Sequence, residues 1–321
     1  MTTYKEIRGT NIEVLASDPS NPVLGQVWYN STSDVVKAQS FNSGSWATSG
    51  NMDTGRRDLA GAGTQTAALG FGGQTSPGTI VALTETYNGS AWSEVSDLNN
   101  ARQYLGGDGV QTSALAFGGQ NPPITNVNQK TESWNGSNWT NVNDLGTGRR
   151  LLAGAGATNT AMLAFGGDPG IANTENWNGS NWTEVADLNT GRSDLAGAGT
   201  NTAALAFGGN PAPAGQTELW NGSSWTEVAD LNIARREVGG AGTSTSAVIF
   251  GGNAPPDKNA TETWNGTNWT ASGNMNVPRA RPGGAGANNT SALAFGGEGP
   301  GTFNSSENFS SGPTTVTFTD S

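Results

Sequence analysis

The chain has 321 residues, of which 48 are Gly and only 13% are charged, and its formal net charge is −11. This acidity disfavours nucleic acid and anionic lipid as partners, because phosphate groups would be repelled, so a neutral or glycan-like partner fits better. Cys and His are both absent, which removes the usual ligands of zinc, copper and haem and leaves only oxygen-ligated ions. Nucleophilic catalysis by Ser-His-Asp or Cys-His groups is excluded as well. We therefore expect a non-enzymatic protein without a cofactor or a metal.

Residues 1–40 do not share the pattern of the rest of the chain, and we expect them to form an attachment segment. The runs Gly25–Asn30 and Val35–Gln39 alternate on either side of a polar turn, which predicts a β-hairpin. The run Ser17–Pro22 is rich in Pro and Asp and indicates a linker or rigid turn. The first residues lack the apolar stretch of a signal peptide, and no run of 18 apolar residues occurs, so neither export nor membrane insertion is expected.

One sequence pattern returns six times from Phe41 onward. A Phe-Gly-Gly triplet occurs at residues 71–73, 117–119, 165–167, 207–209, 250–252 and 295–297. A period of about 45 residues with Gly and aromatic signatures is typical of radial or solenoid repeats.

The copy with the shortest loops spans residues 192–232. Four short strands are predicted in it, at residues 194–199, 203–207, 217–220 and 225–228. The joints are Asn201-Thr202, Gly208-Gly209 and Asn221-Gly222, and Asn-Gly is the preferred pair in a two-residue hairpin turn. Four antiparallel strands per repeat describe a propeller blade.

Three features of the repeat resemble the Kelch repeat of β-propellers. These are the Arg before the first strand, the Gly-Gly that ends the second, and the aromatic pair on the third and fourth, such as Trp220 and Trp225. The resemblance covers about Phe41 to Phe309, although the aromatic pair is closer than is usual in Kelch units. It implies an all-β, six-bladed Kelch-like propeller of four-stranded antiparallel blades over residues 41–321. The expected blades are approximately 56–99, 102–146, 149–189, 192–232, 235–276, and 279–309 together with 41–48.

The ring is expected to close with strands from both ends of the chain. The fourth-strand Trp residues are Trp46, Trp92, Trp139, Trp182, Trp225 and Trp269, and the first of them precedes the first Phe-Gly-Gly. The last copy has its third strand near Ser306–Phe309, so Ser45–Thr48 is predicted to supply its fourth. The tail Thr314–Thr319 alternates like a strand and either competes for this place or extends it.

Two charged positions recur in the repeats. Glu occurs two positions before the first aromatic, at Glu85, Glu132, Glu175, Glu218, Glu262 and Glu307. Arg enters the first strand at Arg102, Arg150, Arg192 and Arg236 with its neighbour Arg235, and at Arg57 and either Arg279 or Arg281 in the outer copies. Six copies favour a structural role, because an active site needs one asymmetric constellation. We predict that each Glu accepts hydrogen bonds from an Arg or from the backbone and locks neighbouring blades together. The run Arg56-Arg57-Asp58 is interpreted as a solvated turn.

The strand expected nearest the axis carries Gly-Ala-Gly in five copies, as in residues 61–63, but Gly107-Asp108-Gly109 in the second. Asp108 is therefore predicted to lie in the central channel. There it either is solvated or hydrogen-bonded, or holds an ion or water.

The loop between the second and third strands of each blade, the b–c loop, varies most among the copies. The b–c loops and the connections between blades lie on one face, and variable loops on a rigid scaffold often carry binding. The candidate ligand-binding residues are Thr79, Ile80, Asn121, Ile124, Thr125, Asn126, Asn253 and Asp257. The alternative is neutral variation in exposed loops.

The run Gly25–Thr32 is similar to a hairpin of bacteriophage tail-fibre and other virion structural proteins, and the Asn-, Thr- and Gly-rich array resembles Kelch-like arrays of marine phages. This resemblance implies a virion protein, made in the host cytoplasm and attached to other virion proteins through residues 1–40. Its b–c loop face would contact a host-surface glycan or receptor, or a neighbouring virion protein. A homo-oligomer is also implied, since fibre proteins are often trimers. The alternative is an intracellular bacterial Kelch-like scaffold for protein interaction.

Overall fold

The computed structural model describes residues 12–121, 126–211, 215–253, 259–299 and 304–318, and its regular elements in this part of the chain are all β-strands. Within these residues no helix is long and apolar enough to cross a membrane. The chain divides into two compact units, one of residues 45–310 and one of residues 1–44 with 311–321.

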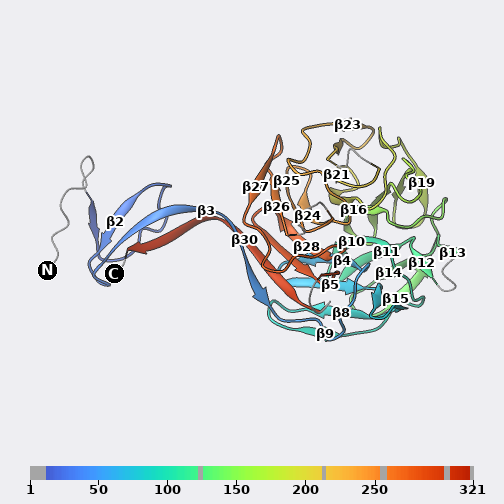
Figure 1. Ribbon diagram of the computed structural model, residues 1–321, viewed down its shortest axis with the longest axis horizontal. Helices are drawn as coiled ribbons and strands as arrows, with labels where there is room; N and C mark the ends of the chain where they lie inside the picture. Colours follow the sequence, from blue (N-terminus) through green and yellow to red (C-terminus); the bar gives the residue numbers. More distant parts are fainter. Residues whose placement is uncertain (1–11, 122–125, 212–214, 254–258, 300–303, 319–321) are drawn as a thin grey trace. The chain divides into compact units, whose positions relative to one another are not determined.

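The larger unit is a β-propeller, in which the sheets are arranged around a central axis (Figure 1). Strands β4, β10, β16, β20, β24 and β28 lie nearest the axis, and β9, β15, β19, β23 and β27 lie at the rim.

Five blades are four-stranded antiparallel sheets. The first consists of β4 (Ala60–Thr64), β5 (Ala67–Phe71), β8 (Thr84–Tyr87) and β9 (Trp92–Glu94); the second of β10 (Gly106–Val110), β11 (Ser113–Phe117), β14 (Thr131–Trp134) and β15 (Trp139–Val142); the third of β16 (Ala153–Thr158), β17 (Ala161–Phe165), β18 (Thr174–Trp177) and β19 (Trp182–Glu184); the fourth of β20 (Ala196–Thr200), β21 (Ala203–Phe207), β22 (Thr217–Trp220) and β23 (Trp225–Glu227); and the fifth of β24 (Gly239–Thr243), β25 (Ser246–Phe250), β26 (Thr261–Trp264) and β27 (Trp269–Ser272).

The prediction of six four-stranded antiparallel blades is wrong. The last repeat, with β28 (Gly283–Asn288) and β29 (Ser291–Phe295), belongs to a six-stranded sheet in the order β1-β2-β3-β30-β29-β28, and its β1–β2 pair is parallel. The cause is the length of β3 (Val35–Ser49) and β30 (Ser306–Phe318). In the five blades an Asn-Gly turn ends the third strand, whereas β30 has Ser310-Ser311 at that point and continues through β-branched residues.

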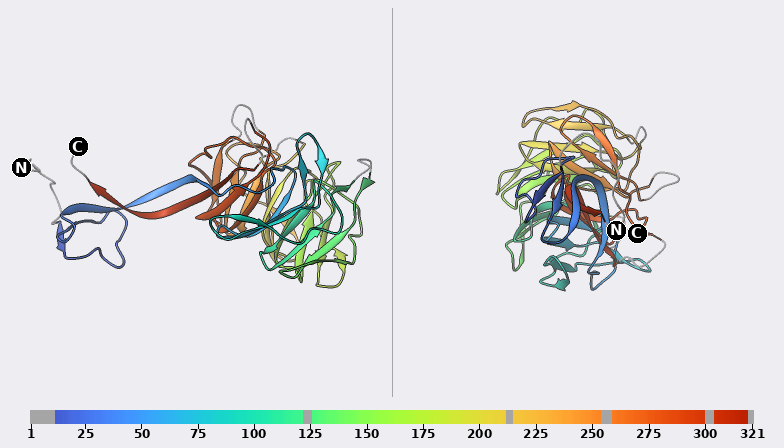
Figure 2. Two further views of the ribbon diagram at one scale, coloured as in Figure 1. Left: turned by 90° about the horizontal axis from the view of Figure 1, so that it is seen from below. Right: turned by 90° about the vertical axis from the view of Figure 1, so that its left-hand side faces the viewer.

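Closure of the ring nevertheless uses both ends of the chain, since β3 and β30 are neighbours in the six-stranded sheet and run side by side (Figure 2). Trp46 packs against Phe250 and Phe309, with ring centroids 5.2 Å apart in both pairs. Of the two alternatives for the tail, extension is the one observed. Residues 314–318 continue β30, and β3 is the strand beside it.

The fourth-strand Trp residues join each blade to the one before it. Trp139 of the second blade packs on Phe71 of the first, with ring centroids 5.0 Å apart, and its indole Nε1 donates a 3.0 Å hydrogen bond to Thr84 Oγ1. Equivalent indole hydrogen bonds join Trp182 to Thr131, Trp225 to Thr174, Trp269 to Thr217, Trp46 to Thr261 and Trp92 to Ser306. These Trp residues therefore form the core between blades, and each satisfies its polar atom there.

The smaller unit contains β1 (Glu13–Leu15), β2 (Val27–Asn30) and the outer parts of β3 and β30. The predicted hairpin is present, since β2 pairs antiparallel with β3 and Val27 lies opposite Ala38. Trp28, Asn30 and Lys37 all donate hydrogen bonds to the Asp18 carboxylate. These bonds, the one from Lys37 above all, lower the pKa of Asp18 to about 2. The sequence prediction ended the attachment segment at residue 40, whereas this unit also includes residues 311–321.

Candidate functional site

The repeated Arg and Glu residues form buried ion pairs within each blade. The pairs, with their N–O distances, are Arg56–Glu85 (2.8 Å), Arg102–Glu132 (3.1 Å), Arg149–Glu175 (3.1 Å), Arg192–Glu218 (3.2 Å), Arg235–Glu262 (3.1 Å) and Arg279–Glu307 (2.8 Å). Glu132 Oε2 also accepts hydrogen bonds from the backbone and side chain of Asn99, on the connection from the first blade to the second. Each Glu of this kind thus fastens the incoming chain to its blade.

Three of the predicted Arg partners are wrong. Arg57 pairs with Glu298 and Asp58, and its neighbour Arg56 enters the first blade. Arg150 instead pairs with Asp168 at 2.9 Å and donates to Gln120, and Arg236 lies 3.9 Å from Glu237. Their predecessors Arg149 and Arg235 enter the blades. The sequence contains a signal that separates them. Each buried Arg stands three positions before Leu, Val or Pro, as Arg102 does before Leu105, whereas Arg150 and Arg236 stand three positions before Ala and Gly.

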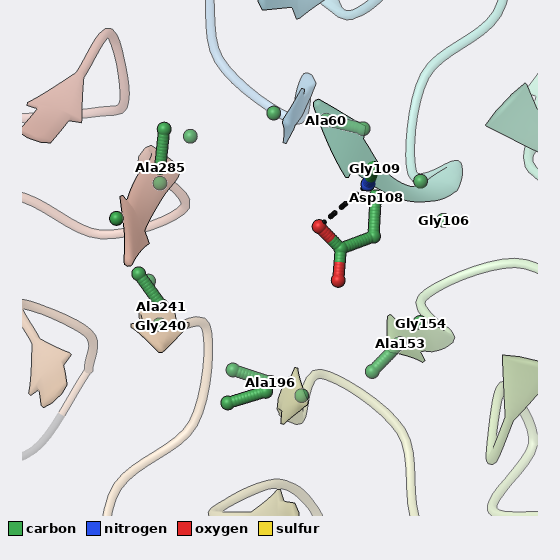
Figure 3. Close-up of a pocket in the computed structure, with 18 of the residues that line it drawn as sticks. Ala60, Gly106, Asp108, Gly109, Ala153, Gly154, Ala196, Gly240, Ala241 and Ala285 are labelled. Carbon is green, nitrogen blue, oxygen red and sulfur yellow. Dashed lines mark hydrogen bonds between the residues drawn. The ribbon is translucent and has the colours of Figure 1, made fainter. Parts of the chain in front are cut away.

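The inner strands consist largely of Gly and Ala because their backbones converge on the axis. A Cβ atom added to Gly197 would lie 2.3 Å from the carbonyl oxygen of Gly154 on the neighbouring strand, and one added to Gly61 would lie 2.4 Å from that of Gly284. These strands line a central cavity of about 380 Å³ (Figure 3).

Asp108 points into this cavity, where the other strands present Ala (Figure 3). Its Oδ1 accepts a 2.7 Å hydrogen bond from the Gly109 N–H, and its Oδ2 accepts a 3.0 Å bond from the Gly156 N–H. Burial raises the pKa of Asp108 to about 7, against the effect of these two bonds. The structure therefore gives Asp108 backbone partners, and the described residues contain no group of three or more acidic side chains suited to a metal ion.

A second cavity, of about 120 Å³, is lined by two consecutive residues from each of the six repeats. The first members are Asp58, Tyr104, Leu151, Asp194, Glu237 and Arg281, which we name the mouth ring. The second members are Leu59, Leu105, Leu152, Leu195, Val238 and Pro282, which also line the larger cavity and which we name the apolar collar. The collar lies between the two cavities.

The mouth ring is held by its backbone. All six members have φ between 54° and 58°, in the left-handed region. The N–H groups of Tyr104, Leu151, Asp194, Glu237 and Arg281 each donate to the carbonyl oxygen of the preceding member, over 2.7 to 3.0 Å. The left-handed conformation thus turns each of these peptide groups toward its neighbour around the axis.

The charged side chains of the mouth ring interact with one another. Arg281 donates a 3.0 Å hydrogen bond from Nη2 to Glu237 Oε1, lies 3.5 Å from Asp58 Oδ1 through Nη1, and stacks over Tyr104 with Cζ 5.5 Å from the ring centroid. Burial raises the pKa of Asp58 to about 6, although Arg281 and a hydrogen bond from Gln74 oppose this shift. Burial and the neighbouring Glu237 raise the pKa of Asp194 as well.

The mouth ring and the b–c loops open on the same face of the propeller, which we name the loop face. The residue before each ring member pairs with the first residue of the b–c loop in five of the repeats, as Arg57 does with Gln74 and Gln103 with Gln120. The sequence interpretation of Arg56-Arg57-Asp58 as a solvated turn is wrong, because Arg56 and Asp58 are buried.

The predicted ligand-binding residues belong to b–c loops of separate blades. Thr79 and Ile80 form β7 (Thr79–Ile80), paired with β6 (Gln74–Thr75), and Asn121 and Asn126 pair between β12 (Gln120–Asn121) and β13 (Asn126–Val127). Asn253 pairs with Arg236. Ile124, Thr125 and Asp257 lie outside the described residues. None of the described candidates lines either cavity.

Sequence reasoning missed the mouth ring. Its signal is a position that varies among the copies and is flanked by positions that repeat. With the collar residue that follows, the six copies read Asp-Leu, Tyr-Leu, Leu-Leu, Asp-Leu, Glu-Val and Arg-Pro. No protein-family model matches this chain, and no curated protein sequence matches it. The structure shows that the chain has a β-propeller fold.

Proposed function

We propose that this chain is a non-enzymatic binding protein of a phage virion, a tail fibre or another appendage, built on a Kelch-like propeller. The loop face contacts a host-surface glycan or a neighbouring virion protein, and residues 1–40 attach the chain to the particle. The resemblance of the Gly25–Thr32 hairpin to virion proteins supports the setting.

The observation that carries the binding role is that the b–c loops on the loop face differ in structure between blades. The first and second blades are neighbours, and each extends its b–c loop into a two-stranded hairpin, β6–β7 and β12–β13; in the described part of the chain the other blades have no such hairpin. Ser76–Thr79 are exposed at the tip of the first hairpin. Hydroxyl and amide groups carried on a rigid frame suit hydrogen bonding to a neutral glycan.

The repeated buried carboxylates support a role other than catalysis. Each Glu that faces an Arg inside a blade is engaged by that Arg and by the incoming connection, as Glu132 is by Arg102 and Asn99. These groups hold the frame together and are not directed at a substrate.

The test is to shorten the two hairpins and measure binding to host cells and to an array of surface glycans. In one variant, residues 74–83 and 120–130 are both replaced by the short loop 168–173. We expect at least about a ten-fold loss of binding, because the projecting contacts are removed. Unchanged binding would contradict the assignment of the loop face.

A matched control alters the opposite face, where the turns between the third and fourth strands lie beside the turns between the first and second. Ser137 and Ser223 are exposed in these turns, and Gly136 of the same turn lies close to Thr112. The double variant Ser137→Glu, Ser223→Glu should bind as the unaltered chain does. Loss of binding in this control, with binding retained after loop replacement, would move the binding site to the opposite face.

A further inference from the structure

The mouth ring has residues with side chains at positions whose backbone conformation favours glycine. Positive φ is unfavourable for a residue with a Cβ atom, and this chain uses Gly at such angles elsewhere, as at both Gly72 and Gly73. Among the residues that the structure describes, Asp34 is the only non-Gly residue at positive φ outside the ring. Strain retained at six equivalent positions indicates that the side chains themselves are needed.

These side chains give the small cavity an excess of negative charge. Asp58, Asp194 and Glu237 line it with a single cation, Arg281, so that three carboxylates face one guanidinium. Two further cations touch the ring from outside. Arg57 lies 3.5 Å from Asp58 Oδ2 but also pairs with Glu298 at 3.0 Å, and Arg236 lies 3.9 Å from Glu237.

Two buried polar atoms of the ring residues lack a hydrogen-bond partner, the acceptor Asp58 Oδ1 and the donor Arg281 Nε. Asp58 has a side chain that is 1% exposed, and its Oδ1 accepts no hydrogen bond. Arg281 Nη1 lies 3.5 Å from Oδ1, at the same distance as Arg57 Nε from Oδ2, and Arg281 makes its shorter contact to Glu237 through Nη2. Asp194 Oδ2 accepts a long 3.4 Å bond from Ser193. A buried carboxylate oxygen without a donor is costly, so a ligand with several N–H donors would be stabilised there.

The floor of the cavity is apolar, since the collar residues lie beneath the ring and Leu151 contributes a further apolar side chain. A volume of about 120 Å³ suits a small molecule, because a cavity of roughly 150 Å³ admits one of the size of benzene.

We propose that the mouth ring is a binding site for a small alkylammonium ion, a protonated primary amine on a short apolar stem. The ammonium group donates its hydrogen bonds to the carboxylates of Asp194 and Glu237, which are adjacent in the ring, and the stem contacts Leu151 and the collar. This site goes beyond the proposed function, because the ring forms it and the b–c loops do not, so either proposal can fail alone.

The test is an NMR titration of the full chain with n-butylammonium chloride at low ionic strength and pH 8, with 1-butanol as a neutral probe of the same shape. We expect saturable binding of n-butylammonium in the millimolar range and none of 1-butanol. Asp194→Asn should weaken binding at least about five-fold, since it removes a charge-assisted hydrogen bond. Glu94→Gln, which removes an exposed carboxylate on β9, should change it less than about two-fold.

A second variant, Leu151→Lys, tests the same site if Asp194→Asn folds poorly. It places a tethered ammonium group in the ring, so it should abolish binding of the free amine while thermal unfolding stays cooperative. Equal binding of 1-butanol would overturn the proposal. So would undiminished binding in the Leu151→Lys or folded Asp194→Asn protein, or loss of binding on Asp108→Asn in the larger cavity instead.

Discussion

Buried charges occupy two neighbouring layers of the propeller, and the two layers are built in opposite ways. The Arg–Glu pairs inside the blades are the same in all six repeats, and each carboxylate receives both an Arg and backbone donors, as Glu132 does. In the mouth ring, two residues further along the chain from each Arg, the residue type varies among the repeats, with Asp in two of them. Asp58 keeps an oxygen without a hydrogen bond. Repetition of the same pair marks the frame, and variation at an equivalent position marks a candidate site. Incomplete hydrogen bonding does not separate the layers, because buried frame atoms such as Arg102 Nε also lack a hydrogen bond.

The strongest test of this contrast removes one member of a frame pair. Glu132→Ala leaves Arg102 buried without its carboxylate and frees the Asn99 connection, so we expect a loss of about 3–5 kcal/mol in the free energy of unfolding. Denaturant unfolding measures it, with Glu94→Ala on an exposed strand position as the control, expected within about 0.5 kcal/mol. A loss below about 1 kcal/mol would show that the pair is dispensable and that repetition does not mark the frame.

The frame was largely predictable from the sequence because its signals repeat. In the fourth blade the strands predicted at 203–207 and 217–220 are β21 and β22, and Gly208, Gly209 and Gly222 have the positive φ that Gly permits. The two-residue turn expected at Asn221-Gly222 is wrong, because Trp220 pairs with Trp225 and the turn has four residues. The first strand was predicted to begin at Asp194 but begins at Ala196, because Asp194 adopts the left-handed conformation.

The parts that could not be predicted depend on context that one copy does not contain. The number of four-stranded blades was wrong because β3 and β30 continue past the ring, and the length of a terminal strand is not encoded in the internal repeats. The mouth ring was missed because positive φ at residues such as Leu151 and Tyr104 contradicts their local preference and is imposed by the hydrogen bonds around the axis.

The pH dependence of stability tests the charge state of the ring. The pKa of Asp58 is raised to about 6 in the folded chain from 3.8, so between these values the folded state binds more protons than the unfolded state. Stability contributed by this group is therefore present below about pH 4 and is lost as the pH rises through about 6.

Asp58→Asn cannot ionise, so it should lose less stability than the unaltered chain between pH 4 and pH 7, by about 2 kcal/mol. Denaturant unfolding at several pH values measures the difference between the two proteins. The control is Asp53→Asn, which removes a carboxylate that is exposed on the connection into the first blade. Parallel pH profiles for the Asp58→Asn and unaltered proteins would show that burial does not penalise this charge.

The smallest expected effect concerns the backbone of the ring alone. Leu151 has φ of 54°, where the Cβ atom costs about 1–2 kcal/mol, so Leu151→Gly should be more stable than Leu151→Ala by about 1 kcal/mol. At an ordinary extended position the order is reversed, because Gly is about 0.5–1 kcal/mol worse than Ala; Ser93 on β9 supplies that control as Ser93→Gly against Ser93→Ala. Thermal and denaturant unfolding of the four variants give the two differences. If Gly were the less stable residue at both positions, the ring would carry no strain, and the retention of its side chains would no longer point to a ligand.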